Sequence, residues 1–224
     1  MVVISFDPDS SREWATPIRR NGLGQLFTRP WGDLDAYRVL LNSPCSLAVF
    51  DVPDERPLSV VRDHIKALSL IAPVVVLAAK CRSVDELLNA GAVDALPRHA
   101  PAQEISARLR ADLRWLATHQ VERPERRSLS GPGPADMPRG GSGSRTSQAS
   151  QAFMLDLLTA QSESGVTFSC HDLRLLLGSA GTPLSRRALR GRVERLSPKL
   201  SAMGHRLSRN HQWGQDFFRV EAAS

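Results

Sequence analysis

A Pro-, Gly- and Ser-rich segment near the middle of the chain limits its fold more than any other feature. Residues 120–149 read QVERPERRSLSGPGPADMPRGGSGSRTSQA, with almost no apolar side chain. Such a segment cannot bury enough surface to offset the entropy of ordering, and it is too long for an ordinary loop inside one domain. We therefore predict two folded domains, 1–119 and 150–224, joined by a flexible linker at 120–149.

The first domain alternates short apolar runs with helical patterns. The runs are rich in β-branched residues and bounded by turn residues, which is typical of buried parallel strands. They cover 2–6, 47–52, 73–79 and 93–97, with a weaker one at 24–28, and the helical patterns cover 10–21, 31–42, 57–70, 83–90 and 101–118. This alternation predicts an α/β fold with a doubly wound parallel sheet, whose functional groups gather at the carboxyl ends of the strands.

Two segments of this domain resemble the receiver domain of bacterial response regulators, which has a CheY-like (βα)5 fold. The strand LAVFD ends in Asp51, where that family carries its phosphoacceptor aspartate. The segment NAGAVDALPRHAP at 89–101 is similar to the family's A-G-A-x-D-Y-L-x-K-P run. The resemblance spans nearly all of 1–118 and implies a phosphorylation pocket around Asp51.

The other pocket positions depart from the family pattern. The acidic pair that holds Mg²⁺ aligns with Ser5 and Phe6, the switch hydroxyl with Ala78 and the lysine with Arg98. Aspartyl phosphorylation needs a divalent cation, which Mg²⁺-binding proteins normally hold with one or two carboxylates. Of that chemical set only Asp51 is present, so we expect a degenerate receiver in which this aspartate is vestigial.

Three further interpretations of the pocket stay open. Asp7 lies one residue beyond the acidic pair and could replace a metal ligand, which would allow conventional phosphorylation of Asp51. Arg98 could pair bidentately with Asp51 and lock the domain in one conformation, because the guanidinium fork suits a carboxylate. The apolar Phe6 at the pocket mouth is compatible with a small-molecule ligand or a partner protein.

The positive charge of the chain lies entirely in its C-terminal half. The net charge is +6, yet residues 1–120 hold 14 basic and 14 acidic residues, whereas 121–224 hold 15 basic and nine acidic ones. Residues 184–209 alone contain eight basic side chains and one acidic side chain, Glu194. A positive field focused in this way attracts a polyanion, which favours a nucleic acid as the partner.

The second domain reads as three helices followed by a hairpin. An amphipathic helix covers 150–160, a β-like step covers 166–168, and Ser169 and Ser185 are expected to cap the second and third helices. Strands are expected at 205–213 and 215–220. We expect Pro198 to kink the third helix or to end it near Leu196. Three helices and a hairpin form the plan of a winged helix-turn-helix domain.

This half resembles the DNA-binding domain of OmpR/PhoB-type response regulators, on LRGRVERLSPKL and a terminal FFRV strand. The resemblance implies that the third helix enters the major groove and that the hairpin contacts phosphate or the minor groove. The chain is thus predicted to be a sequence-specific transcription regulator that binds double-stranded DNA. The candidate DNA-binding residues are Arg186, Arg187, Arg190, Arg192, Arg195, Lys199, Arg209 and His211.

The resemblance to response regulators also predicts protein partners. We expect a homodimer through the receiver domain, and the alternative to DNA binding is an adaptor that docks on RNA polymerase or another acidic protein. Trp14, Trp31 and Trp115 are expected to be core or interface anchors.

No enzyme chemistry or cofactor is expected, because no nucleophile–base pair, phosphate loop or acidic dyad is present. The spacing of Cys45, Cys81 and Cys170 matches no metal site. No apolar run is long enough to span a membrane and no signal peptide is visible, so a cytoplasmic protein is expected.

Overall fold

The computed structural model places an α/β half and a smaller helical and β-sheet half side by side. It describes residues 1–23, 26–43, 46–53, 55–78, 84–119, 143–162, 166–179, 181–212 and 214–222. In that part of the chain, no helix has the length and apolar character needed to cross a membrane.

The N-terminal half is built on a five-stranded parallel sheet. Its strands are β1 (Val2–Ser5), β2 (Phe27–Pro30), β3 (Ala48–Val52), β4 (Val74–Ala78) and β5 (Ala92–Pro97), in the order β2-β1-β3-β4-β5. From β1 the chain adds β2 on one side and then β3, β4 and β5 on the other, as in the CheY-like doubly wound sheet. The predicted α/β fold is confirmed, and only β2 lies clearly later than its predicted run.

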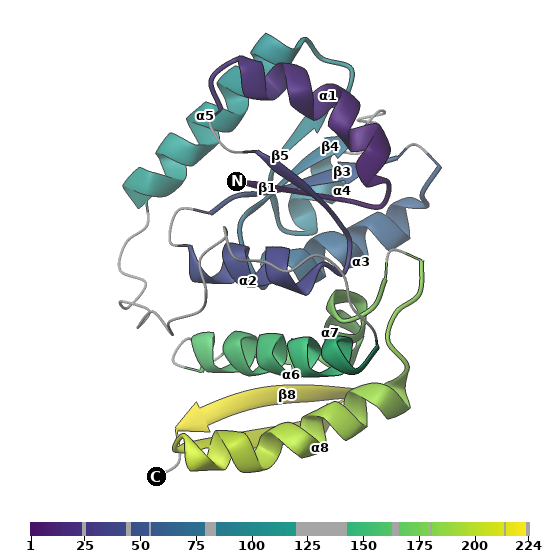
Figure 1. The fold of residues 1–224 in the computed structure, drawn as a ribbon, viewed down its shortest axis with the longest axis vertical. Helices are drawn as coiled ribbons and strands as arrows, with labels where there is room; N and C mark the ends of the chain where they lie inside the picture. Colours follow the sequence, from purple (N-terminus) through teal and green to yellow (C-terminus); the bar gives the residue numbers. More distant parts are fainter. Residues whose placement is uncertain are drawn as a thin grey trace.

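Helices cover both faces of this sheet (Figure 1). They are α1 (Pro8–Arg20), α2 (Leu34–Asn42), α3 (Leu58–Ser69), α4 (Val84–Asn89) and α5 (Ala102–His119). Helices α1 and α5 share one apolar core with one face of the sheet, while α2, α3 and α4 pack on the other. Helix α5 packs on the sheet through one apolar stripe, because Ile105, Leu109 and Leu116 recur at helical spacing and are buried.

The C-terminal half contains three helices and a three-stranded antiparallel sheet. In chain order it comprises α6 (Gly143–Ala160), β6 (Phe168–Ser169), α7 (Cys170–Leu176), α8 (Arg186–Ala202), β7 (His205–Gln212) and β8 (Gln215–Ala222), with strand order β6-β8-β7. Ser169 and Ser185 cap α7 and α8 as expected, because their hydroxyl oxygens accept the amide hydrogens of Asp172 and Ala188.

Helix α6 begins earlier than the predicted helix. It includes residues 143–149, which the composition assigned to the linker, and the remaining linker residues, 120–142, lie outside the described part of the chain. Once Phe153, Met154 and Leu157 are anchored in the core, each preceding residue extends the helix at little cost, because propagation is far easier than nucleation.

Of the two outcomes expected for Pro198, the end of the helix near Leu196 was wrong, and the kink stays a prediction. Helix α8 does not end near Leu196 but continues to Ala202, with Pro198 inside it. Leu196 and Leu200 are both buried and hold the turns on either side of the proline. Pro198 itself is exposed, so water can reach the backbone carbonyl that loses its helical hydrogen bond.

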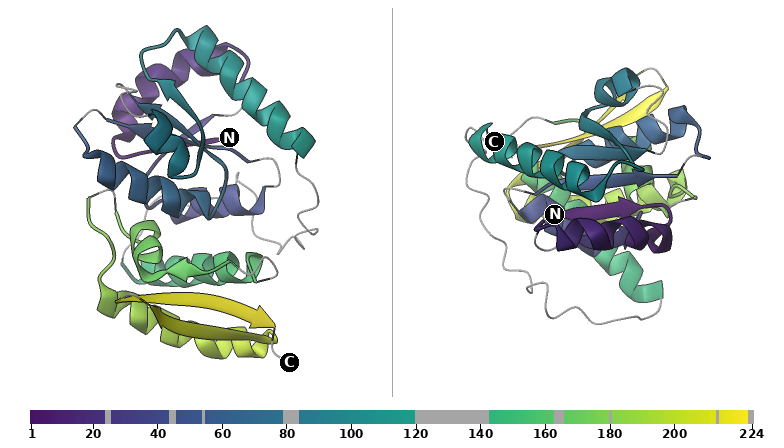
Figure 2. Two further views of the ribbon diagram at one scale, coloured as in Figure 1. Left: turned by 180° about the vertical axis from the view of Figure 1, so that it is seen from behind. Right: turned by 90° about the horizontal axis from the view of Figure 1, so that it is seen from above.

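The two halves share one apolar core, which the predicted division into domains did not anticipate. Helices α6 and α7 lie against α2 and α3, on the side of these helices that faces away from the sheet (Figures 1 and 2). Phe153, Leu157 and Leu173 belong to the same buried cluster as the sheet residues Ile4 and Phe50. Helix α8 and the β7–β8 hairpin lie beyond α6 and α7, far from the sheet (Figure 1).

Candidate functional site

Asp51 lies at the carboxyl edge of the sheet, where the receiver-like sequence predicted a pocket. It is the fourth residue of β3, pairs in register with Ser5 of β1, and is only 1% exposed. The hydroxyl groups of Ser5, at 3.3 Å, and of Ser11 donate hydrogen bonds to its Oδ2. Two short side chains from β1 and α1 therefore cover this carboxylate.

Arg98 completes the enclosure of Asp51. Its Nε lies 3.1 Å from Oδ1 of Asp51, and its Nη2 lies 3.2 Å from Oδ2. The same Nη2 donates a 2.7 Å hydrogen bond to Ser10. This confirms the predicted pairing of Arg98 with Asp51. The pair links β3 to the segment after β5. Removing one partner of a buried ion pair typically lowers the free energy of unfolding by about 3–5 kcal/mol, because the other charge is left buried and unpaired.

Asp7 does not replace the missing acidic pair. Its carboxylate caps α1 and accepts the amide hydrogens of Asp9 and Ser10, both at 3.2 Å. At the position of the switch hydroxyl, the carbonyl of Ala78 accepts the Arg98 amide hydrogen at 2.9 Å. Within the described ranges no group of three His, Cys, Asp or Glu side chains could hold a metal ion. The Asp7 carboxylate is therefore engaged as the cap of α1.

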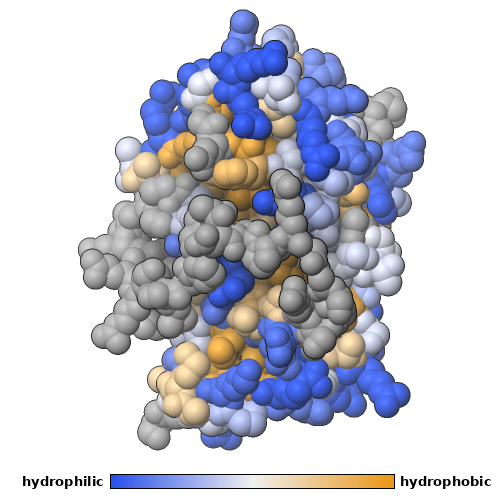
Figure 3. All heavy atoms as spheres, viewed as in Figure 1, coloured by the Kyte–Doolittle hydropathy of each residue, from blue (hydrophilic) through white to orange (hydrophobic). Residues whose placement is uncertain are grey.

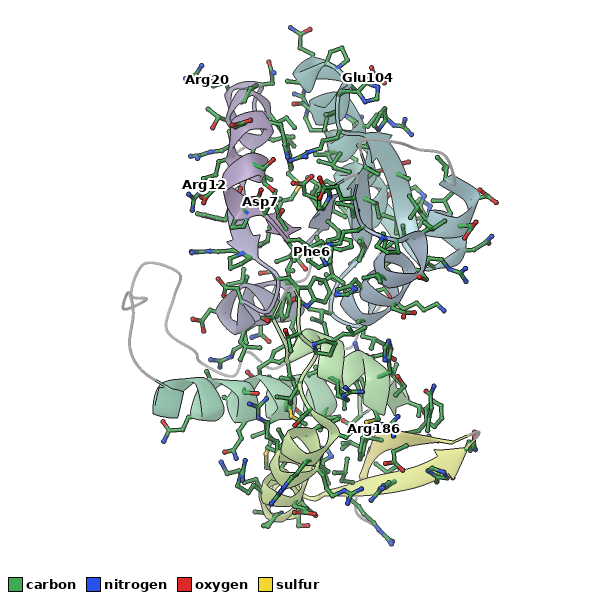
Figure 4. All side chains as sticks on the ribbon, turned by 90° about the vertical axis from the view of Figure 1, so that its right-hand side faces the viewer. Phe6, Asp7, Arg12, Arg20, Glu104 and Arg186 are labelled. Carbon is green, nitrogen blue, oxygen red and sulfur yellow. The ribbon has the colours of Figure 1, made fainter. Side chains whose placement is uncertain are left out.

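Phe6 joins a group of rings beside this edge of the sheet, which we call the aromatic cluster: Phe6, Trp31, Phe50 and His64. The Phe6 ring centroid lies 5.3 Å from that of Phe50 and 4.9 Å from that of His64, and Trp31 lies 4.5 Å from His64. Arg56 sits over the Phe6 ring at 4.7 Å. Figure 4 shows Phe6 next to Asp7 in the N-terminal half, on the side of Asp7 that is nearer the C-terminal half. At the position where the receiver family has an acidic residue, Phe6 is therefore part of an aromatic cluster.

Trp31 connects the aromatic cluster to the C-terminal half. Its indole N–H donates a buried 2.9 Å hydrogen bond to the carbonyl of Leu175 in α7. Next to it, Gly32 has φ +86°, and a Cβ at this position would lie 2.2 Å from the carbonyl oxygen of Gly178. Only glycine permits this contact, in which the segment after β2 touches the turn between α7 and α8.

Polar contacts extend the same interface. Arg38 of α2 pairs with Asp156 of α6 at 2.8 Å, and His171 of α7 lies 3.2 Å from Asp63 of α3. The side-chain amide of Gln161 donates to the Leu70 carbonyl at 3.1 Å. The interface therefore combines a continuous apolar core with paired polar groups along its length.

His64 gives the aromatic cluster a pH-dependent stability. Its Nδ1 lies 2.7 Å from the carbonyl of Val60 and acts as a donor to it in the neutral ring. Burial lowers the pKa of His64 below its ordinary value of 6.5, and this effect outweighs the opposing influences of the Val60 carbonyl and Asp63. The folded protein therefore favours the neutral ring.

We expect the free energy of unfolding to fall as the pH drops below about 6.5, because the unfolded chain then binds a proton that folded His64 resists. Urea denaturation at pH 7.5 and 5.5 measures this loss. His64→Gln should show a smaller loss between the two pH values, since the other titrating groups are unchanged. An equal loss in both proteins would assign the pH dependence to other groups.

The candidate DNA-binding residues of α8 fall on different sides of the helix. Arg186, Arg187, Arg190, Arg195 and Lys199 are exposed. Arg192 is half-buried; burial and neighbouring Arg195 lower its pKa, and it lies nearer the core side than predicted. The surface over α8 is mostly hydrophilic (Figure 3). The helix thus presents a basic outer face, while its Leu189, Leu196 and Leu200 side is buried.

The two candidate residues of the hairpin share one carboxylate. Arg209 contacts Asp216 at 2.7 Å and His211 contacts it at 3.0 Å, with Asp216 on the facing strand β8. These two hydrogen bonds hold the pKa of Asp216 below its ordinary value. Part of the positive charge predicted for the hairpin is therefore neutralised within the hairpin itself.

The three tryptophans expected to be anchors have different surroundings. Trp31 is buried, and Trp14 is partly buried against the core of α1, α5 and the sheet. Trp115 is 54% exposed, so it does not anchor a core, and its expected role at an interface stays a prediction. Of the three cysteines, Cys170 is a free thiol at the start of α7, whereas Cys45 and Cys81 lie outside the described residues.

The chain matches no protein-family model and no curated protein. Among solved structures it is similar to one described by the words "A novel family of redox sensors in the streptococci evolved from two-component response regulators". The identity is 11% and the TM-score 0.37, over 99% of this chain and 98% of that one. The assignment of a receiver-like half therefore rests on the strand order of the sheet and on the position of Asp51.

Proposed function

We propose that the chain is a bacterial-type transcription regulator that binds double-stranded DNA and whose receiver-like half works without phosphorylation. The C-terminal half has the element order of a winged helix-turn-helix, with α8 as the recognition helix and β7–β8 as the wing. The basic outer face of α8 is the observation that carries the DNA-binding part. The enclosure of Asp51 by Arg98 carries the part concerning phosphorylation.

The outer face of α8 has the composition of a groove-binding surface. Arg187, Glu194 and Arg195 lie around Gly191 on this exposed side. A Cβ at Gly191 would meet only the Arg195 side chain, at 3.8 Å, so packing does not require glycine there. A small residue between arginines lets a helix approach base edges closely, and Arg is the commonest side chain that reads guanine in the major groove.

A salt titration with random-sequence duplex tests the DNA-binding proposal. The logarithm of the binding constant should fall linearly with the logarithm of salt concentration, with a slope of about −0.9 per phosphate contacted. Genome-wide mapping of bound DNA would then identify specific sites. Binding to RNA polymerase in the absence of any duplex binding would instead favour an adaptor.

The conventional alternative keeps phosphorylation on Asp51. We expect no phosphoryl label on the chain after incubation with acetyl phosphate and Mg²⁺, because the carboxylate of Asp51 is buried and already paired with Arg98. Intact mass spectrometry of the wild type and of Asp51→Asn measures this. A label present in the wild type and absent in Asp51→Asn would establish phosphorylation and overturn this part of the proposal.

A dimer through the receiver-like half is supported by three exposed apolar side chains on consecutive elements. Leu88 of α4, Val93 of β5 and Trp115 of α5 are 43%, 41% and 54% exposed. Helices α4 and α5 both contact β5, and exposed apolar patches are typical of interfaces. We propose that a second copy of the chain covers them. Sedimentation velocity of the wild type and of Leu88→Glu tests this, and a monomeric wild type would reject it.

A further inference from the structure

A cleft of about 500 Å³ lies between α7, α8 and the β7–β8 hairpin. This volume falls within the range typical of small-molecule sites, about 300–1,000 Å³. The cleft does not coincide with the outer face of α8, since neither Arg187 nor Arg195 lines it. It is therefore distinct from the Arg187 and Arg195 surface, while four other candidate DNA-binding residues line it: Arg186, Arg190, Arg209 and His211.

The interior of the cleft is apolar and its rim is cationic. Leu189 and Val193 of α8 and Leu207 and Phe218 of the hairpin form apolar lining. Four arginines line the same cleft: Arg174 of α7, Arg186 and Arg190 of α8, and Arg209 of β7. Figure 4 shows Arg186 at the start of α8, beside the hairpin.

The arginines of the cleft differ in how they are held. The Nε of Arg174 donates a 2.6 Å hydrogen bond to the carbonyl of Leu184, which fixes that side chain before any ligand arrives. Arg186 and Arg190 make no ion pair with a described residue. Two carboxylates line the cleft, Glu194 and Asp216. Asp216 is already paired with Arg209 and His211, which leaves Glu194 to oppose the other arginines. The cleft therefore keeps an excess of positive charge.

We propose that this cleft binds a small amphipathic organic anion. An aryl or alkyl body would cover Val193 and Leu207, and its carboxylate, sulfonate or phosphate group would lie among Arg174, Arg186 and Arg190. Charge-assisted hydrogen bonds from arginine supply the orientation, and apolar burial supplies affinity. A DNA backbone is a poorer occupant, because a sugar-phosphate strand has no apolar body for the recessed floor.

The ligand site does not depend on the proposed function, but one consequence does. Arg186 and Arg190 are candidate DNA-binding residues, so an anion held by them would compete with DNA phosphates. Thermodynamic linkage then requires that bound duplex lowers the affinity for the anion by the same factor as the bound anion lowers the affinity for duplex. The proposed ligand would act as a molecule that releases the regulator from DNA.

Titration of the full chain with 1-anilinonaphthalene-8-sulfonate tests the site without DNA, because this fluorescent probe combines aromatic rings with a sulfonate. Arg190→Gln should weaken binding by about tenfold or more, since a hydrogen bond to a charged group is lost. Val193→Phe should also weaken it by filling the cleft. Arg187→Gln is the matched control: it removes the same charge from the exposed face of the same helix and should leave binding unchanged. Near-UV circular dichroism of each variant confirms native packing, because partly folded states also bind the probe.

Two results would overturn the site. One is equal probe affinity in the wild type, Arg190→Gln and Val193→Phe; the other is equal weakening by Arg190→Gln and Arg187→Gln, which would show a general effect of charge. Loss of duplex binding in Arg190→Gln with no probe binding in the wild type would assign the cleft to the DNA backbone. If the cleft binds the probe and a bound duplex does not displace it, the ligand site stands and only the competition with DNA is rejected.

Discussion

Trp31→Ala is expected to lower the free energy of unfolding of the whole chain by about 3–5 kcal/mol, the usual cost of truncating a large buried aromatic side chain. The substitution leaves a cavity in the aromatic cluster and deprives the Leu175 carbonyl of its buried donor. Because Trp31 lies between the halves, both should lose stability together. Urea denaturation followed by far-UV circular dichroism measures the total loss.

Hydrogen exchange distinguishes a shared loss from a local one. In Trp31→Ala, the amides of α8 and the hairpin should exchange faster, along with those of the parallel sheet. Phe27→Ala is the matched control, because that aromatic side chain is 43% exposed, lies outside the proposed dimer surface and should cost far less. If the α8 amides keep their wild-type protection in Trp31→Ala, the halves are energetically independent and the shared core contributes little.

Arg187→Ala and Arg195→Ala are each expected to weaken binding to a specific DNA site by about 1–3 kcal/mol, if the side chain reads a base. Both arginines lie on the exposed outer face of α8, so neither truncation should affect folding. Fluorescence anisotropy with a mapped site and with random duplex, at one fixed salt concentration, measures specific and non-specific binding.

The control for these variants is Arg114→Ala, which removes an exposed arginine from α5 in the other half. It should leave both affinities unchanged. Loss of affinity for random duplex alone would indicate phosphate contacts rather than base contacts. Unchanged affinity in both Arg187→Ala and Arg195→Ala would reject the outer face of α8 as the recognition surface.

The elements of the N-terminal half were predictable because their patterns are local. A run such as VVVLA (Val74–Ala78) is short, rich in β-branched residues and fully buried, and it lies between helices whose apolar residues repeat at helical spacing. The Arg98–Asp51 pair was also predictable, since the strand order brings the ends of β3 and β5 to one edge of the sheet. The aromatic cluster was missed because Trp31, Phe50 and His64 are far apart in sequence and match no motif.

One signal of the shared core was present in the sequence. The helix at 34–42 has apolar residues around most of its circumference, including Leu34, Tyr37 and Val39. A helix that is apolar on all sides is buried on more than one side, whereas a helix that covers one sheet face needs a single apolar stripe. Helix α2 is apolar in this way because it lies between the sheet and α6.

The order and type of the helices and strands, and the basic character of α8, follow from the sequence alone. Each reflects a local periodicity or composition, which records whether a side chain faces water or protein. Such a pattern does not record which protein surface it meets. Only the tertiary structure decided that α6 and α7 pack on α2 and α3, that Trp31 bonds Leu175, and that the arginines of α8 divide between an outer face and a cleft. The contacts of α6 and α7 with α2 and α3, and the hydrogen bond from Trp31 to Leu175, join residues more than a hundred positions apart, and the packing of complementary shapes selects them.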